Sequence, residues 1–524
     1  MQMRLPLSAI LTGLCAGLAF AQSTTTSVAW PHQTFKSEPT FQPPVFKVTP
    51  GSGTPAPGYI VYAPAGIVPQ PAPLITTNDN DLVWHGEIGE QTFALTVSQY
   101  RNESVLAYWT GTPYPEPVGR GYGYVVLLNN AYEVVANITL AGNFVTASGA
   151  TFDSNIDLHE IFITNRGTVL VTANNVTQTD LTSVGGPSDG WVVDGQFYEI
   201  DIATNQVLFS WNSLNHTSSI PFSFSTYPLG SEGFDAKNKT DAWGYFHINA
   251  VAPYDDGYII SSRYTCSEYH ISAQGDVVWR LGGVDGGDFV QGPNTSFCYQ
   301  HDIRPVYSSL DSYAVPRNAT LHLHDNANCP IDNGTVPSSG LVLNIDVDNM
   351  KVSLVNRYRN PLDPLYSTAQ GSHQPLPAAG GKGNVFVGHG IIPYIEEFSH
   401  DGSIVQTIQF GVGYFDLSYR AFKYSWHGCP TTKPAVAVEA VSYDKSKLDL
   451  FVSWNGATDV TAWRVYAVAD DGSSHLIAEA QKSGFETRVR VPNAAKMKVE
   501  AVLRKGSKCR QGKGAGISDI IHVN

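Results

Sequence analysis

One repeating pattern constrains this 524-residue chain more than any other feature of its sequence. The pattern is an apolar-alternating strand, a turn rich in Asp, Asn and Gly, and a second strand that ends near a bulky residue. It recurs at residues 124–138, 197–212, 268–283, 341–358 and 394–411. A second kind of hairpin precedes several of these segments, so a unit holds four strands. Units of four short strands at intervals of several tens of residues are typical of a β-propeller.

The number of units predicts the size of the propeller. Five are visible, and the strand-like stretches at 73–87 and 105–113 supply a sixth. Residues 41–73 are rich in Pro and Gly, which favours an extended lead-in wrapped on the body. We therefore expect an all-β fold, with a six-bladed β-propeller and its lead-in occupying residues 22–428.

The last part of the chain, residues 429–524, has a different character. Residues 447–480 alternate strictly between apolar and polar and carry Trp454 and Trp463, a pattern typical of a small fibronectin type III-like β-sandwich. This part holds 14 Lys+Arg against 10 Asp+Glu, whereas the whole chain is acidic. Its basic stretch at 488–514 is a candidate contact for an acidic surface such as a cell-wall polymer. A solvated face is the simpler interpretation.

The first 21 residues resemble a secretory signal peptide. Arg4 provides the positive end, residues 5–20 the apolar stretch, and Ala19-Phe20-Ala21 a small-x-small cleavage site. No later stretch is apolar enough to cross a bilayer. The sequence therefore predicts a secreted protein, extracellular or in the endomembrane lumen, with a signal peptide at 1–21.

Acceptor motifs for N-glycosylation agree with secretion, because they matter only in that compartment. Eight Asn-x-Ser/Thr motifs occur, all before residue 340. The predicted glycosylation sites are Asn102, Asn137, Asn175, Asn215, Asn238, Asn294, Asn318 and Asn333.

The cysteines also fit an oxidising compartment. Five remain after removal of the signal, enough for two disulfides and one odd thiol. We expect Cys429 to pair with Cys509, because these two bracket the C-terminal segment. Two of Cys266, Cys298 and Cys329 are expected to pair with each other, and the sequence leaves open which two.

Histidines recur at one position of the predicted blades. Three inner hairpins open with His159, His247 and His373, while His301 opens another strand and His389 ends one. The innermost strand of each blade lines the central channel of a propeller. A single histidine is more often a structural group, but several at equivalent positions are expected to converge on one funnel.

Two arginines stand close to these histidines. Arg263 follows the strand that begins after His247, and Arg304 lies three residues after His301. Because the body is acidic, an anionic substrate would have to be met by such local cations. The alternative for Arg304 is an ion pair with Asp302 that holds loops together.

Several motifs together resemble those of a known family. "HINAV", "YIISSRYTCSEYHIS", "GDVVWRLGG", "FCYQHDIRPV" and "LHLHDNAN" are similar to the arylsulfotransferase (ASST) family in its fungal secreted branch. The resemblance extends over roughly residues 36–412, and the C-terminal sandwich lies outside it. It implies a six-bladed propeller with a histidine-lined funnel. It also implies transfer of a sulfuryl group from a phenolic sulfate to a phenol without PAPS, through a histidine intermediate.

The resemblance also implies roles for individual residues. His247 and His301 match the family's site motifs most strongly, with Arg263 beside them. The family's nucleophilic histidine lies in a late blade, where His373 and His389 are both candidates, and His373 is favoured because it starts a strand. The substrate contacts are predicted at His159, Asn249, Asp302, Arg304 and His324.

Three functions fit these residues. The first is the aryl sulfotransferase, because a neutral imidazole can attack sulfur and divide the transfer into two steps. The second is a cyclase or isomerase that uses the same funnel for acid–base work on a natural product. The third is a propeller that binds an extracellular ligand without catalysis.

The expected substrate is a small phenolic or aromatic molecule, and no cofactor is expected. The sequence has no Gly-rich phosphate loop for PAPS, no zinc-ligand spacing and no basic-aromatic face for nucleic acid, so neither a metal nor a nucleic-acid partner is predicted.

Overall fold

The computed structural model describes most of the chain. The described residues are 30–66, 68–89, 91–114, 119–329, 335–378, 382–413, 416–507, 509 and 516–523. In this part the only helices are 3₁₀ segments of three or four residues, and strands account for the rest of the regular structure. The predicted all-β class is confirmed. The predicted signal peptide and the acceptor Asn333 lie outside the described residues.

Five sheets follow one another along the body of the chain, and in each the four main strands pair in sequential, antiparallel order. The first two sheets contain β6 (Thr92–Tyr100), β7 (Glu103–Tyr114), β8 (Arg120–Leu128) and β9 (Val134–Ile138), then β10 (Ile161–Ile163), β11 (Thr168–Thr179), β12 (Gly190–Asp201) and β13 (Val207–Asn212). The third contains β14 (Ile248–Tyr254), β15 (Gly257–Ser262), β16 (Ser267–Ile271) and β17 (Val277–Gly282), with the short β18 (Gly286–Gly287).

The next two sheets each add a strand at the outer edge. The fourth contains β20 (His301–Pro305), β21 (Asn318–Asp325), β22 (Ser339–Asp346) and β23 (Lys351–Tyr358), with β19 (Val290–Gln291) parallel to β23. The fifth contains β24 (Ser372–Pro375), β25 (Val385–Gly388), β26 (Tyr394–Phe398) and β27 (Ile404–Gln409), with β1 (Lys47–Pro50) paired to β27.

A sixth sheet joins the two ends of the body. Its order is β29 (Ala421–Tyr424), β2 (Tyr59–Tyr62), β4 (Leu74–Thr76) and β5 (Leu82–His85), so strands more than 350 residues apart lie side by side. Another such pair is β3 (Ala65–Gly66) with β28 (Asp416–Leu417). The ends of the body are therefore fastened together by backbone hydrogen bonds.

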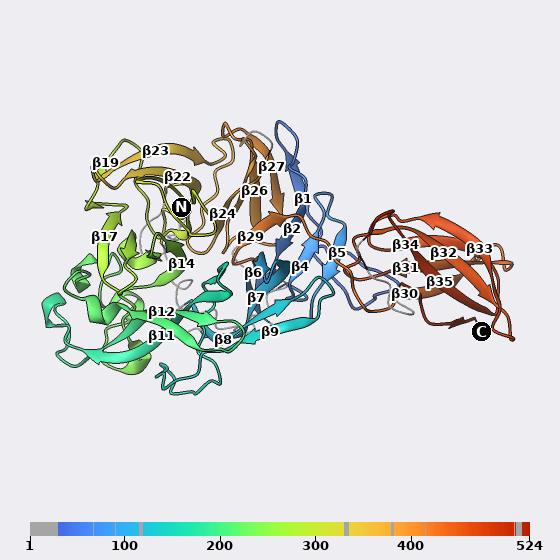
Figure 1. Cartoon of the computed structure of the whole chain (residues 1–524), viewed down its shortest axis with the longest axis horizontal. Helices are drawn as coiled ribbons and strands as arrows, with labels where there is room; N and C mark the ends of the chain where they lie inside the picture. The colour runs from blue at the N-terminus through green and yellow to red at the C-terminus, as the bar shows by residue number, and fades with distance from the viewer. Residues whose placement is uncertain are drawn as a thin grey trace, which may run out of the picture.

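The C-terminal segment forms a separate lobe of two sheets beside the body (Figure 1). One contains β30 (Ala435–Ala440), β31 (Lys447–Ser453) and β34 (Thr487–Pro492), and the other β33 (Ser474–Gln481), β32 (Val460–Val468), β35 (Lys496–Leu503) and β36 (Ile521–His522). Trp454 and Trp463 are buried in the core between them. The alternation of the sequence places these side chains inward, because successive residues of a strand face opposite sides.

The hairpins bring particular residues to one end of each sheet. Two adjacent antiparallel strands place the start of the first and the end of the second at the same end. Ile248 pairs with Ser262, His301 with His324, and Ser372 with Gly388. These pairs come from three successive sheets. The histidines in or beside them therefore lie at the same end of each sheet.

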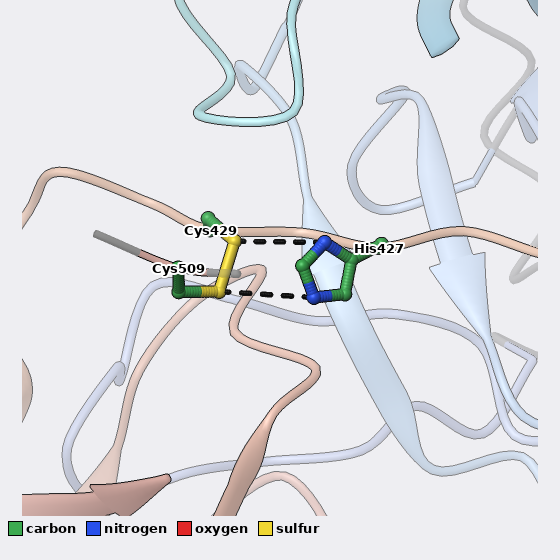
Figure 2. A group of neighbouring side chains, drawn as sticks. All are labelled: His427, Cys429 and Cys509. Atoms are coloured by element: carbon green, nitrogen blue, oxygen red, sulfur yellow. Dashed lines mark hydrogen bonds between the residues drawn. A yellow bond between two sulfur atoms is a disulfide. The ribbon is translucent and has the colours of Figure 1, made fainter. Parts of the chain in front are cut away.

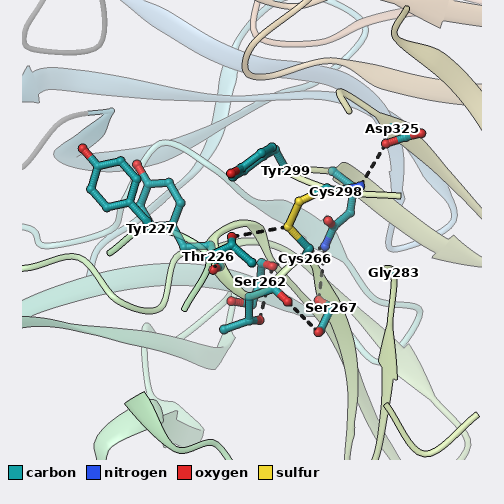
Figure 3. The surroundings of a disulfide bond; sticks show 12 residues. Thr226, Tyr227, Ser262, Cys266, Ser267, Gly283, Cys298, Tyr299 and Asp325 are labelled. Carbon is teal, nitrogen blue, oxygen red and sulfur yellow. Dashed lines mark hydrogen bonds between the residues drawn. A yellow bond between two sulfur atoms is a disulfide. The ribbon is translucent and has the colours of Figure 1, made fainter. Parts of the chain in front are cut away.

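Two disulfides occur within the described residues, Cys266–Cys298 and Cys429–Cys509. The first joins the residue that follows the 3₁₀ turn Arg263–Thr265 to a residue just before β20 (Figure 3). Cys329 is buried and takes part in neither disulfide. No helix of the described part of the chain has the length and apolar character of a membrane crossing.

Candidate functional site

Asp157, His159 and His247 form a buried chain of side chains. Asp157 Oδ2 contacts His159 Nδ1, and His159 Nε2 lies 3.0 Å from His247 Nε2. The two imidazole rings meet edge to face, with centroids 4.5 Å apart. All three residues are buried. The sequence places His159 just before β10 and His247 just before β14, so neighbouring sheets supply the two rings.

The contacts determine which ring nitrogen carries a proton. The pKa of Asp157 is lowered: burial raises it, but the neighbouring His159 ring and the hydrogen bonds from His159 and the Gly121 amide outweigh burial. An ionised carboxylate can only accept, so His159 in its neutral form donates from Nδ1 and presents a lone pair at Nε2. His247 then donates from Nε2, which leaves a lone pair on its Nδ1. This Nδ1 is buried and has no hydrogen-bond partner among the described residues.

His301 has a different environment. Asn326 donates from Nδ2 to the carbonyls of Ser367 (3.2 Å) and Gln370 (2.9 Å), so its Oδ1 is the acceptor for His301 Nδ1, at 2.7 Å. The Gln370 amide donates to His301 Nε2 at 3.1 Å. His301 is therefore a neutral imidazole with both ring nitrogens engaged. It suits a rigid wall of a site better than a nucleophile.

A second pair of histidines also ends in a carboxylate. His389 Nε2 lies 3.0 Å from Glu396 Oε2, and His389 Nδ1 lies 3.4 Å from His324 Nε2. The three residues are buried, and His324 Nδ1 has no hydrogen-bond partner among the described residues. His324 lies near the end of β21 and His389 follows β25, so this pair also joins two neighbouring sheets. The described part of the chain thus contains a second carboxylate–histidine–histidine chain.

Burial keeps His247, His301 and His324 neutral. Desolvation is the largest cause that lowers the pKa of His247 well below its usual value, followed by the charge of Arg120. Desolvation also lowers the pKa of His301 well below its usual value, followed by the charge of Arg263. The pKa of His324 falls to about 3, again mainly through desolvation. A neutral imidazole is the form that can attack an electrophile or accept a proton.

Tyr419 lies between the first chain and His301. Its ring meets those of His159 and His301 edge to face, with centroid distances of 5.5 Å and 6.3 Å. The side chain is buried, and its hydroxyl has no hydrogen-bond partner within the described part of the molecule. Burial raises the pKa of this hydroxyl, so it stays protonated and can donate.

Two arginines contribute positive charge beside His247. The Arg263 amide donates to the carbonyl of His247 at 2.9 Å, and its guanidinium donates to Tyr264 Oη (3.0 Å) and to the carbonyl of Thr368 (2.8 Å). Arg120 is buried and donates from Nε to Asn174 at 3.0 Å. Both arginines lower the pKa of His247. The site therefore carries local cations although the chain is acidic.

A buried ion cluster lies next to the site. Glu160 contacts Arg304 (2.9 Å) and Arg420 (2.8 Å), and Asp302 Oδ1 lies 3.0 Å from Arg304 and 3.4 Å from Arg420. Arg420 also donates to the carbonyl of Asn249 at 3.2 Å. Arg304 and Asp302 therefore form ion pairs inside the protein. This is the arrangement that the alternative interpretation of Arg304, as a residue that holds loops together, describes.

His373 makes no ring hydrogen bond to another predicted histidine among the described residues, although, after burial, the nearby His324 helps to lower its pKa. Its amide donates to Asp302 Oδ2 at 3.1 Å, while its ring packs against His322 (5.1 Å between centroids) and Tyr358 (5.7 Å). Neither of its ring nitrogens has a hydrogen-bond partner among the described residues. The structure therefore brings His159, His247, Arg263 and His301 together. His324 and His389 join each other, and His373 faces a packed interior.

Sequence reasoning missed several of these residues. Asp157 had a usable signal, since a carboxylate two residues before a histidine in "DLH" can reach its ring. Tyr419 and Gln370 carried none, because their positions depend on how distant sheets meet. The residues missed are Asp157, Asn326, Gln370, Glu396, Tyr419, Arg120, Glu160 and Arg420.

The structure also shows the surroundings of the predicted glycosylation sites and of the basic side chains in the C-terminal lobe. Of the glycosylation acceptors within the described residues, Asn175 is half-buried in β11 and the others are exposed. In the C-terminal lobe many basic side chains are ion-paired, for example Arg488 and Arg490 with Asp449. Such pairing reduces the positive charge available to an acidic partner.

Comparison with protein-family models gives a match. The family model described as Arylsulfotransferase (ASST) matches residues 96–411. A search of the curated proteins found no match.

Among solved structures, the chain is similar to the α-L-arabinofuranosidase Arb93A from Fusarium graminearum, at 10% identity and a TM-score of 0.33, covering 75% of this chain and 93% of that one. It is also similar to the α-L-arabinanase of Penicillium chrysogenum, at 12% identity and a TM-score of 0.30, covering 76% and 94%. Likenesses this weak carry no argument about activity. The family model, in contrast, covers more than half of the chain, and the protein belongs to the arylsulfotransferase (ASST) family.

Proposed function

We propose that this protein is an aryl sulfotransferase that moves a sulfuryl group from a phenolic sulfate to a phenol, without PAPS, through a histidine intermediate. Its family implies aromatic substrates. The observation that carries the proposal is the buried chain from Asp157 through His159 to His247, which leaves a lone pair on His247 Nδ1. A neutral imidazole in such an arrangement is an activated nucleophile.

In the first half-reaction, His247 Nδ1 attacks the sulfur in line with the bond to the phenolic oxygen. The N–S bond forms, the S–O bond breaks, and the phenolate leaves with the bonding electron pair. Positive charge develops on His247, and the proton on its Nε2 can shift toward His159 Nε2. The Asp157 carboxylate stabilises that charge, as the third member of a catalytic triad does.

In the second half-reaction, the oxygen of the acceptor phenol attacks the same sulfur. The N–S bond breaks and His247 recovers its lone pair. The departing phenolate takes up one proton and the acceptor phenol gives one up, so the proton balance closes over the cycle. In this proposal the pair His324–His389, with Glu396 behind it, relays a solvent proton to the phenolate that leaves in the first step and passes the proton of the acceptor phenol back to solvent in the second.

The positive groups have a separate role. A sulfate ester carries negative charge on its non-bridging oxygens, and that charge shifts during transfer. Arg263 and Arg120 provide a fixed positive field beside His247. Fixed charges in a buried site act without reorganisation, which is the main source of electrostatic catalysis. The late histidines His373 and His389 stay alternative nucleophiles, and isotopic labelling of the covalent intermediate separates all three.

The wider architecture fits this proposal. We infer that the six sheets of the body are the blades of one β-propeller, because each has sequential four-strand order or closes the body through β29 and β2. We infer that the C-terminal lobe is a fibronectin type III-like sandwich. Two disulfides and the exposed acceptor asparagines support a secreted glycoprotein. We propose that it belongs to the fungal secreted branch of the family, which its motifs resemble. Contact of the lobe with a cell wall stays a prediction.

The direct test is a donor–acceptor assay. The purified protein is mixed with p-nitrophenyl sulfate and a phenol acceptor without PAPS, and nitrophenol release is followed. We expect acceptor-dependent release that is lost in His247→Ala. His270→Ala is the matched control, because His270 is also buried but packs against Tyr254 and Trp279 in the third sheet. Release that persists in His247→Ala would contradict the assignment.

One observation favours the cyclase or isomerase as a second candidate. The two carboxylate-supported histidine pairs give the site two separate proton-handling groups, which acid–base chemistry on a neutral substrate requires. This candidate predicts no nitrophenol release from any aryl sulfate. It also predicts solvent deuterium in a carbon–hydrogen position of the natural substrate, lost in both His247→Ala and His324→Ala.

A further inference from the structure

A second cluster of reactive side chains lies far from the histidine pairs, where the body meets the C-terminal lobe. His427 comes from the linker after β29, Cys429 follows it, and Cys509 lies beyond β35. The ring of His427 faces both sulfurs of the Cys429–Cys509 disulfide (Figure 2). Its Nδ1 lies 3.7 Å from Cys429 Sγ, and its Nε2 lies 3.9 Å from Cys509 Sγ.

A buried carboxylate orients this imidazole. Asp459 Oδ2 lies 2.7 Å from His427 Nε2, and the other oxygen of Asp459 lies 2.8 Å from Arg504 Nε. With Arg504 beside it the carboxylate acts as an acceptor, so His427 donates from Nε2. The lone pair of His427 is therefore on Nδ1, the nitrogen that faces Cys429. A carboxylate on the far nitrogen of an imidazole is the arrangement found behind metal-ligating histidines.

The donor atoms have the spacing of a metal site. The ligand atoms of His427, Cys429 and Cys509 all lie within 4.8 Å of one another. Zinc takes thiolate at about 2.3 Å and imidazole nitrogen at about 2.0 Å in a tetrahedral site, so small shifts suffice for one ion to reach all three. Two thiolates and one imidazole are soft donors that favour zinc over magnesium or calcium. All three side chains are partly exposed, so an ion can reach them.

We propose that His427, Cys429 and Cys509 bind one zinc-class divalent cation when the Cys429–Cys509 disulfide is reduced, with Asp459 holding His427 in position. A dithiol supplies two electrons and two protons: the S–S bond breaks, two thiols form, and the dithiol becomes a disulfide. The cation then displaces both thiol protons to water and accepts the lone pair of His427 Nδ1. A water molecule completes four-coordination. The same residues thus hold either a disulfide or a metal.

Either state preserves one cross-link. The Cys429 amide donates to the Asn130 carbonyl at 2.7 Å, and Trp426 Nε1 donates to Tyr132 Oη at 2.9 Å, so the linker is fixed to the body. Cys509 belongs to the C-terminal segment. A metal bridge therefore ties the same two parts of the chain as the disulfide does. It would serve the chain before the disulfide forms, since metal binding to a folded site stabilises that fold.

The test uses the full-length protein and cobalt as a spectroscopic probe. The protein is reduced with a dithiol, freed of it by gel filtration under argon, and titrated with Co²⁺ and then Zn²⁺. We expect thiolate-to-Co²⁺ charge-transfer absorption that saturates at one equivalent and is displaced by Zn²⁺. The oxidised protein should show none. Zn²⁺ should also raise the melting temperature of the reduced protein toward that of the oxidised protein.

Three variants make the result specific. Cys429→Ser/Cys509→Ser keeps Cys266, Cys298 and Cys329, so any absorption it shows comes from those thiols. His427→Gln retains the disulfide when oxidised and should bind at least about 10-fold more weakly once reduced. Asp459→Asn should weaken binding about 10- to 100-fold, the usual effect of removing a carboxylate behind a ligating histidine. The proposal is overturned if reduced wild type binds no more Co²⁺ than the double serine variant, or if His427→Gln binds as wild type does.

Discussion

His159 Nε2 lies 3.0 Å from His247 Nε2, and the other nitrogen of His159 contacts Asp157. Because the carboxylate accepts, each ring donates in one direction only, and the chain ends in a lone pair on His247 Nδ1. His247 is thereby prepared for attack without being charged. The proposed mechanism depends on this relationship, since a protonated imidazole is no nucleophile.

Asp157→Asn should reduce sulfuryl transfer by about 10²-fold or more, because an amide can donate to His159 and so impose the wrong tautomer. The measurement is kcat with p-nitrophenyl sulfate and a phenol acceptor. Thr172→Val is a suitable control, since Thr172 also contacts Asp157 Oδ2, at 3.1 Å, without contacting either ring. An Asp157→Asn rate within twofold of wild type would contradict the relay.

The buried histidines should make stability depend on acidity. Burial lowers the pKa of both His322 and His324 from the ordinary value of 6.5 to about 3. Their contribution is fully present above pH 6.5 and is lost as pH falls toward 3, because the unfolded chain then binds protons that the folded chain excludes. We expect up to about 1.4 kcal/mol per pH unit from each histidine. Denaturant unfolding at pH 7.5, 6.5, 5.5 and 4.5 measures this, and a flat profile below pH 6.5 would be inconsistent with it.

Glu268 should make folding stability depend on pH in the direction opposite to that of the buried histidines. It is fully buried, and desolvation raises its pKa well above the usual value, although Ser261 and Gln300 act in the opposite direction. A raised folded pKa means that stability is lost as pH rises above the unfolded value of 4.5. Glu268→Gln should therefore stabilise the protein at pH 7 by on the order of 1 kcal/mol. The gain should shrink toward pH 4, and a pH-independent difference would argue for packing instead.

Removing Arg420 should be costly. It contacts Glu160 at 2.8 Å inside the protein, and without it the two buried carboxylates Glu160 and Asp302 would share Arg304 alone. Losing one partner of a buried ion pair costs about 3–5 kcal/mol. Arg420→Ala should show this in denaturant unfolding. Arg464→Ala is the control, because its pair with Glu479 is exposed and such pairs contribute about 0–1 kcal/mol.

The fold was largely predictable from local pattern. Each hairpin carries its own turn residues; for example, Asp255 and Asp256 connect the paired residues Tyr254 and Gly257, and Asp255 has φ of +51°. The sheets therefore follow from sequence. The pairing of β29 with β2 does not, because it joins segments more than 350 residues apart.

The sequence predicted a residue of the candidate site only where the end of a strand determines the position of that residue. His247 immediately precedes β14 and His301 begins β20, so their common placement follows from the hairpins. Tyr419 cannot be placed in this way, since it reaches His159 only when the last sheet closes on the second. His373 lies at the start of β24, yet its ring turns toward His322. Which side of a short strand faces the site depends on packing that periodicity alone does not specify.

The most direct test of the central claim is to trap the covalent intermediate. The protein is incubated with a ³⁵S-labelled aryl sulfate without acceptor, quenched in alkali, digested and mapped by mass spectrometry. The account predicts label on the peptide that contains His247, released when a phenol is added before the quench and absent in His247→Ala. Label on the peptide of His373 or His389, or acceptor-dependent turnover with no labelled histidine, would contradict it.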